Sequence, residues 1–260
     1  MTWVRLSTEE GVATITLTAP KGPSRINVES AREWLGILDE VESDDSVSVI
    51  VTRADGSVWN AGGDLPEFRS RGTAAHDYIL EIGQWINPVV SRIYRSRKLT
   101  FASVHGAVAG GGLGPMLASD LVIASEETVF TLGYSKLATN PDAGVSWLLP
   151  RVVGYRKALE LYLTSERLGA GAARELGLIN MVAPAGHLEV ETRDWAERLG
   201  SLPPQAVAAT KRLLKDSATA GLEEHADAEI RSFAENTRHP DFSAGVNAFL
   251  GDRGQQDGSG

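Results

Sequence analysis

The sequence predicts an α/β fold, in which short buried strands alternate with amphipathic helices. Short apolar runs recur along the chain, at 47–52, which is rich in β-branched residues, and at 99–104. Such runs are typical of strands that are buried on both faces. Between them, apolar residues recur at helical spacing, as they do after Asn27. Strands that alternate with helices indicate repeated crossovers and a parallel sheet.

The N-terminal two thirds of the chain supply the strands. Residues 12–17 alternate between apolar and polar side chains, which predicts a strand. We expect residues 3–6 to pair with this strand across the turn at Glu10-Gly11. A glycine cluster at 110–112 follows the strand at 99–104. The elements expected after it are a helix over 113–119, strands over 121–124 and 129–131, and an apolar helix over 145–149.

The last third of the chain predicts helices only. Apolar residues recur on one helical face from Leu188, and Pro203-Pro204 ends that helix and begins another. A third helix is marked by the spacing of apolar residues from Leu222. We therefore expect a core over 1–187, a C-terminal helical segment over 188–253 that supports oligomer contacts, and a polar, glycine-rich tail over 254–260 that is disordered.

The composition excludes several classes of function. The 25 basic and 34 acidic residues give a net charge of -9, which repels nucleic acid and acidic membrane surfaces. The chain has no cysteine, so it forms no disulfide, thiolate zinc site or cysteine nucleophile. We expect no secretory signal, and no apolar run approaches the ~20 residues of a membrane helix. We expect a cytoplasmic protein.

Two glycine-bearing segments, 60–65 and 105–113, are the first candidates for chemistry. Glycine lets a ligand approach the backbone closely, and free N–H groups at the start of a helix bind an anion or a developing oxyanion. The alternative is that both segments are only turns. A dinucleotide fingerprint fails, because Pro115 stands where counting from Gly110 requires the last glycine. The Gly-x-Ser-x-Gly motif of α/β-hydrolases is also absent.

Asp142 is the second candidate. It precedes the apolar helix expected over 145–149, so from the residues alone it is interpreted as a helix cap. The five histidines include no pair at metal-ligand spacing on a helix, and no metal site is predicted.

The ordered motifs of the chain resemble the crotonase superfamily, the enoyl-CoA hydratases and isomerases. The most specific stretches are 61–64, 104–112 and 137–154. The resemblance implies a spiral of stacked ββα units, followed by helices that pack into homotrimers, often paired as hexamers. It also implies an acyl-CoA substrate and no cofactor apart from the coenzyme A of that substrate.

The resemblance also assigns roles to residues. The backbone N–H groups of Gly63 and Gly111 would form the oxyanion hole. The substrate-binding residues would be Arg25, near the CoA phosphates, Ala61, Gly62, Asp64 and Leu65, along the adenine pocket, and Tyr134.

The chain departs from the hydratase pattern at two positions. Hydratases of this superfamily use two glutamates, and here Gly114 and Tyr134 take their places. Asp142 stands where dienoyl-CoA and 1,2-epoxyphenylacetyl-CoA isomerases carry a catalytic aspartate, and where 4-chlorobenzoyl-CoA dehalogenases carry a nucleophile. The expected function is therefore an isomerisation with Asp142 as acid and base. The alternatives are a hydratase that uses Asp142 alone, a hydrolytic dehalogenase, a silent acyl-CoA-binding paralogue, or an enzyme whose acid is Glu67 or Glu81.

Overall fold

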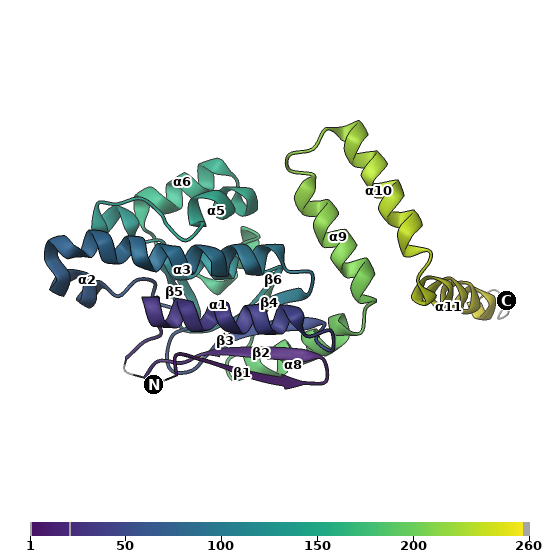
Figure 1. Ribbon diagram of the computed structural model, residues 1–260, viewed down its shortest axis with the longest axis horizontal. Helices are drawn as coiled ribbons and strands as arrows, with labels where there is room; N and C mark the ends of the chain where they lie inside the picture. The colour runs from purple at the N-terminus through teal and green to yellow at the C-terminus, as the bar shows by residue number, and fades with distance from the viewer. Residues whose placement is uncertain (1, 21, 257–260) are drawn as a thin grey trace. The chain divides into compact units, whose positions relative to one another are not determined.

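Two sheets carry the strands of the computed structural model, which describes residues 2–20 and 22–256 (Figure 1). The larger sheet has six strands in the order β1-β2-β3-β4-β6-β9, and the smaller has the order β5-β7-β8. Among the strands of the described residues, only β1 with β2 and β7 with β8 pair antiparallel. The bounds are β1 (Val4–Glu9), β2 (Val12–Leu17), β3 (Val49–Ala54), β4 (Leu99–Val104), β5 (Ala107–Ala109), β6 (Leu121–Ser125), β7 (Val129–Thr131), β8 (Leu168–Gly169) and β9 (Met181–Ala183).

The α/β prediction is confirmed, and so are its strands. The first two strands pair across Glu10 and Gly11, both of which have positive φ. The parallel pairs that follow need crossovers, and helices provide them. The helices between the strands are α1 (Val28–Ser43), α2 (Leu65–Arg71), α3 (Ala75–Arg95), α4 (Leu113–Ala118), α5 (Val145–Val153), α6 (Tyr155–Thr164) and α7 (Ala170–Glu175), with short 3₁₀ turns η1 (Gly72–Ala74), η2 (Gly110–Gly112) and η3 (Tyr134–Leu137). Helix α8 (Leu188–Gly200) follows the last strand, β9.

Both faces of the large sheet are buried, each against different helices. Successive residues of a strand point to opposite faces. On one face, Ile50 and Ala102 lie in the main core with residues of α1 and α3, which run side by side in Figure 1. On the other face, Val51 and Phe101 pack with residues of α8. Because both faces of the sheet are covered, the sequences of the strands are continuous apolar runs.

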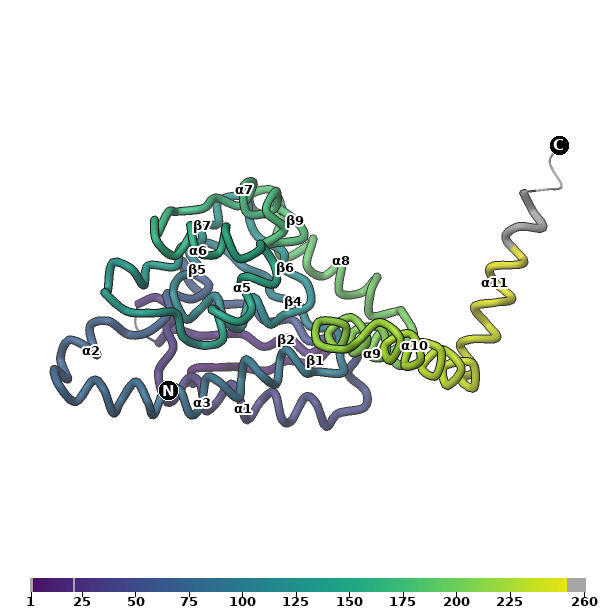
Figure 2. The backbone as a smooth tube through the Cα atoms, turned by 90° about the horizontal axis from the view of Figure 1, so that it is seen from above, coloured from purple at the N-terminus to yellow at the C-terminus, as the bar shows by residue number. Residues whose placement is uncertain are grey.

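The smaller sheet lies beside the helices of residues 145–175. Helix α7 contacts β7 and β8, and α6 contacts η3 and α5. Helices α5, α6 and α7 and strand β7 can be found in the teal and green part of Figure 2. Helix α4 joins the two regions, because it contacts both α3 and α5. The glycines of η2 lead directly into α4, so this short helix begins where the glycine cluster ends.

Residues 201–260 form a second unit, which is separate from residues 1–200. It contains α9 (Pro204–Asp216), α10 (Leu222–Asn236) and α11 (Pro240–Gln256). The first unit ends at Gly200 and includes α8, which packs on the large sheet, where Trp195 meets Phe101 edge to face at 6.4 Å. The expected division into a core over 1–187 and a helical segment over 188–253 stays a prediction.

The expected disordered tail, 254–260, is only partly described. Helix α11 extends to Gln256, and residues 257–260 lie outside the described residues. Within the described part of the chain, no helix has both the length and the apolar character that a membrane crossing requires.

Candidate active site

The two glycine-bearing segments lie side by side, although they are far apart in the sequence. The Trp59 amide donates to the carbonyl of His105 at 3.0 Å, and the Ala109 amide donates to the carbonyl of Asn60 at 2.9 Å. Asn60 and Val108 form an isolated parallel bridge. The two turns are therefore joined through their backbones rather than through side chains.

Gly62 lies at a point of close approach between the turns. Its φ is +80°, and a Cβ there would lie 2.7 Å from the carbonyl oxygen of Ala109 and 3.2 Å from the amide nitrogen of Gly111. Only glycine fits such a position. The buried side chain of Asn60 fixes the turn, because its Oδ1 accepts the Gly62 N–H at 2.8 Å.

The N–H groups of Gly63 and Gly111 are available to a ligand. Within the described residues, neither donates a hydrogen bond to another part of the chain. Gly111 lies in η2, at the start of a helical segment, where N–H groups have no intrahelical acceptor. A Cβ on Gly62 would lie close to the Gly111 amide, and Gly62 precedes Gly63, so two unpaired donors come from adjacent turns. Such a pair can bind an oxyanion.

Asp142 lies at the Gly111 turn. Its Oδ1 is 3.1 Å from the position that a Cβ on Gly111 would take. Its backbone carbonyl accepts the Val145 N–H at 2.9 Å. The interpretation of Asp142 as a side-chain cap is wrong, because the N-cap of α5 is Gly144 and no side chain caps that helix. The Asp142 side chain is exposed, so its carboxylate is accessible.

Tyr134 holds the Asp142 carboxylate. Its ring is buried, with 6% of the residue exposed, and its hydroxyl donates to Asp142 Oδ1 at 2.6 Å. Burial, reinforced by the negative charge of Asp142, raises the pKa of Tyr134 far above its ordinary value. The hydroxyl therefore stays protonated and acts as a donor at neutral pH. This contact could not be predicted from the sequence, because nothing in the residue pattern indicates that positions 134 and 142 meet.

Gly114 packs against the loop that carries Asp142. A Cβ at this position would lie 2.1 Å from the carbonyl oxygen of Ala143 and 3.0 Å from its Cβ. Ala143 is buried and has a φ of +47°, which is unusual for a residue other than glycine. The backbone of the loop thus occupies the space into which a side chain at position 114 would project.

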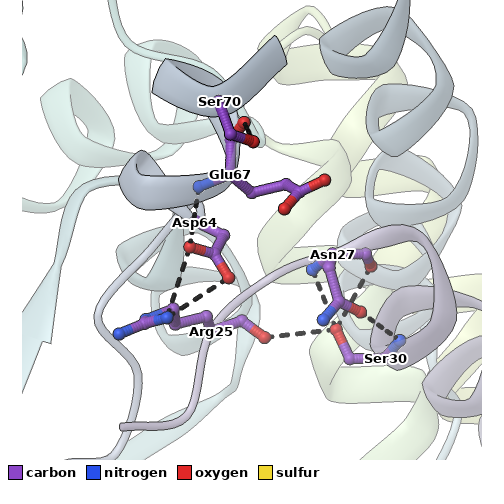
Figure 3. A network of polar contacts seen from close by, with 6 residues as sticks. All are labelled: Arg25, Asn27, Ser30, Asp64, Glu67 and Ser70. Carbon is purple, nitrogen blue, oxygen red and sulfur yellow. Dashed lines mark hydrogen bonds and ion pairs between the residues drawn. The ribbon is translucent and has the colours of Figure 1, made fainter. Parts of the chain in front are cut away.

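Arg25 and Asp64 form an ion pair beside the Gly63 turn, as Figure 3 shows. The Arg25 Nη1 lies 3.2 Å from both carboxylate oxygens of Asp64. Asp64 also caps α2, since it accepts the Glu67 N–H at 3.3 Å. The capping box of Asn27 and Ser30 begins α1, and the Ser30 hydroxyl donates to the Arg25 carbonyl at 3.2 Å (Figure 3). The Arg25 guanidinium therefore stabilises the loop that contains Gly63, through its ion pair with Asp64.

The other residues expected to bind substrate surround the same turn. The Ala61 amide donates to the Ser24 carbonyl at 2.8 Å, and the exposed Leu65 begins α2. A cavity of about 350 Å³ lies next to Asp64, and Glu67 and Glu81 both line it. Glu67 is paired with Arg71 at 2.8 Å.

A larger concavity lies elsewhere in the first unit. It has a volume of about 760 Å³, and its walls are the sheet face of β2 and β3 together with α8. Of the two glycine-bearing segments only His105 lines it, and neither Gly63, Gly111 nor Asp142 does, so we assign the chemistry from the unpaired donors and the carboxylate rather than from cavity size. Within the described residues, no group of three or more His, Asp or Glu side chains is placed to hold a metal ion.

The chain is similar to several known proteins over most of its length. Residues 7–257 match the family model for enoyl-CoA hydratase/isomerase. The chain is 31% identical to a 1,2-epoxyphenylacetyl-CoA isomerase of Escherichia coli K12, over 98% of both chains. It is also 31% identical to a 4-chlorobenzoyl coenzyme A dehalogenase of an Arthrobacter species, over 92% of this chain and 87% of the relative. A solved enoyl-CoA hydratase of Polaromonas sp. JS666 superposes with a TM-score of 0.90 at 29% identity, over 96% of this chain and 97% of that chain.

Proposed function

The chain belongs to the enoyl-CoA hydratase/isomerase family, and from that premise we propose that it moves a double bond within an enoyl thioester of coenzyme A. The observation that carries the proposal is the placement of one accessible carboxylate, that of Asp142, against Gly111, whose amide is unpaired. A carbonyl oxygen bound by that amide brings the carbons next to the thioester close to Asp142.

The oxyanion hole stabilises the negative charge that develops on the thioester oxygen. The thioester oxygen accepts hydrogen bonds from the N–H groups of Gly63 and Gly111. Both donors are backbone groups held by the contact of Gly62 with the second turn, so they need no rearrangement when charge develops. One preorganised donor of this kind typically contributes ~3 kcal/mol to transition-state stability.

Asp142 moves the proton. Its carboxylate accepts a proton from one carbon of the acyl chain, and the electron pair of the broken C–H bond enters the enolate. The carboxyl group then returns the proton to a different carbon, and the electron pair forms the new bond there as the thioester carbonyl is restored. The substrate keeps its composition, because the same group removes and replaces the proton.

The two departures from the hydratase pattern favour isomerisation over hydration. Tyr134 carries a phenol in place of a carboxylate, and its hydroxyl is already bonded to Asp142. Position 114 has no room for a glutamate, because the Ala143 carbonyl lies against it. Addition of water across a double bond needs a base for the water and an acid for the carbon, and a single carboxylate meets only part of that demand.

The test is a product analysis with a panel of short, long and aromatic enoyl-CoA thioesters, in ordinary and deuterated water. Isomerisation leaves the product mass unchanged in ordinary water. A mass gain of one water would instead make the enzyme a hydratase, halide release from a halogenated aroyl-CoA would make it a dehalogenase, and ligand-induced stabilisation without turnover would make it a silent binder.

Asp142→Asn tests the residue assignment. The amide keeps the shape of the side chain but accepts no proton at neutral pH, so we expect a ~100- to 10,000-fold loss of turnover. CoA affinity should stay near that of the parent. Asp45→Asn, the same change at an exposed position in the turn before β3, is the matched control. Parent-like turnover in Asp142→Asn would contradict the mechanism and direct attention to Glu67 or Glu81.

We also propose that the protein is a homotrimer or a hexamer of two trimers, as the family resemblance implies. Helices of the second unit support this, because they expose large apolar side chains such as Leu222, Ile230 and Phe233. Exposed large apolar side chains are typical of protein interfaces where they form a patch.

A further inference from the structure

The two carboxylate oxygens of Asp142 have different surroundings. Oδ1 accepts the Tyr134 hydroxyl at 2.6 Å and lies next to Gly111. Oδ2 accepts no hydrogen bond from the described part of the chain. A carboxylate held through one oxygen presents the other, with its lone pairs free, to whatever enters the site.

The elements around Tyr134 fix its own position. Gly133 precedes it with a φ of +72°, and Ala138 ends η3 with a φ of +55°, so the turn is closed at both ends by left-handed residues. The ring is buried in the main core. A buried aromatic ring on a tight turn has little freedom, so its hydroxyl is a fixed point from which Asp142 is oriented.

We infer that Tyr134 is a positioning residue, which holds Asp142 Oδ1 so that Oδ2 faces the carbon that loses or gains the proton. This inference rests on the proposed function of Asp142 and replaces the substrate-binding role that the resemblance assigned to Tyr134. Because the hydroxyl donates its only proton to Asp142, it has none to donate to a substrate oxygen.

The test compares Tyr134→Phe with Tyr162→Phe. Tyr162 is a matched control, because its hydroxyl donates at 2.9 Å to the carbonyl of Thr139, in the segment that leads to Asp142. The assay follows interconversion of a β,γ-unsaturated hexenoyl-CoA and its α,β-unsaturated isomer, or another enoyl-CoA pair from the panel above. Tyr134→Phe keeps the buried ring, and thermal melting checks that both variants remain folded.

For Tyr134→Phe we expect kcat to fall about tenfold to 100-fold, as for loss of a hydrogen bond to a charged group, with KM unchanged. Tyr162→Phe should stay within about twofold of the parent, since its bond reaches no reacting group. In the Asp142→Asn background, Tyr134→Phe should cause no further loss, because a residue that acts through Asp142 has nothing left to position.

Two results would overturn the inference while leaving the proposed function intact. One is a raised KM with parent-like kcat in Tyr134→Phe, which is the signature of a substrate contact. The other is an equal loss in the parent and Asp142→Asn backgrounds, which is the signature of independent action. Full turnover in Asp142→Asn alone would instead overturn both the proposed function and the inference.

Discussion

Gly114→Ala is the sharpest test of how the loop places Asp142. The added methyl group would begin 2.1 Å from the carbonyl oxygen of Ala143, whereas ordinary van der Waals contact begins at 3.4 Å. The atom that it would meet belongs to the backbone rather than to the end of a flexible side chain, so rotation of a side chain cannot relieve the clash. The loop and α4 must therefore separate by roughly 1 Å.

Two effects of opposite sign decide the stability of this variant. Alanine in a helix is favoured over glycine by about 0.5–1 kcal/mol. Overpacking of a closely packed site costs typically 1–3 kcal/mol. We expect the second effect to exceed the first and the free energy of unfolding to fall by about 1–2 kcal/mol. A displacement of Asp142 by about 1 Å should also lower turnover by ~100-fold.

Gly36→Ala is the matched control, because Gly36 lies in the middle of α1 with no atom within 4 Å of its expected Cβ. This variant should gain about 0.5–1 kcal/mol and keep full turnover. Urea unfolding gives both free energies, and the isomerase assay gives both rates. If Gly114→Ala gains stability as Gly36→Ala does and keeps its turnover, the loop does not depend on this contact and our reasoning fails.

Three further predictions concern the donors, the alkaline limit and assembly. Gly63→Pro should lower turnover ~100-fold, because it removes one donor of the oxyanion hole. Gly63→Ala crowds Phe68 in the same way but keeps the N–H group, so it should not cause this loss of turnover. Equal losses of turnover in the two variants would exclude a role for that N–H group. Above pH 10.0, the ordinary tyrosine pKa, unfolded chains lose the Tyr134 proton while folded chains keep it, so the free energy of unfolding falls as the pH rises. Tyr134→Phe lacks that loss, and its slope in alkaline denaturation should be shallower by ~1.4 kcal/mol per pH unit; parallel slopes would contradict the raised pKa. Sedimentation at micromolar concentration should give a trimer or hexamer, and a stable 27.8 kDa monomer would contradict the assembly.

The local sequence signals predicted most of the strands and several of the helices. The strands β2 and β4 have the expected bounds, because alternation and short apolar runs report burial directly. Helix α1 begins at its capping residue, Asn27. Helix α3 was not predicted, since it contains Gly83 and Pro88, which usually interrupt helices, and its stability comes from packing on α1.

The candidate site was predicted in its parts but not in its assembly. The glycine turns and Asp142 were found from motifs, whereas their contact depends on the fold. The bond from Tyr134 to Asp142 and the approach of Gly114 to Ala143 join residues that no periodicity relates. The ion pair of Arg25 with Asp64 was likewise hidden, because a charge does not reveal its partner in the sequence.

The backbone pairing of the two glycine turns has a consequence for sequence divergence. The proposed oxyanion hole consists of backbone N–H groups, and every residue except proline has a backbone N–H group. Substitutions of neighbouring side chains therefore leave these donors in place. The carboxylate and phenol beside it are side chains, which a single codon change can replace. Relatives near 31% identity bear the names isomerase and dehalogenase. In such a scaffold, natural selection can change the reaction that is catalysed while the backbone groups proposed to bind the thioester stay the same.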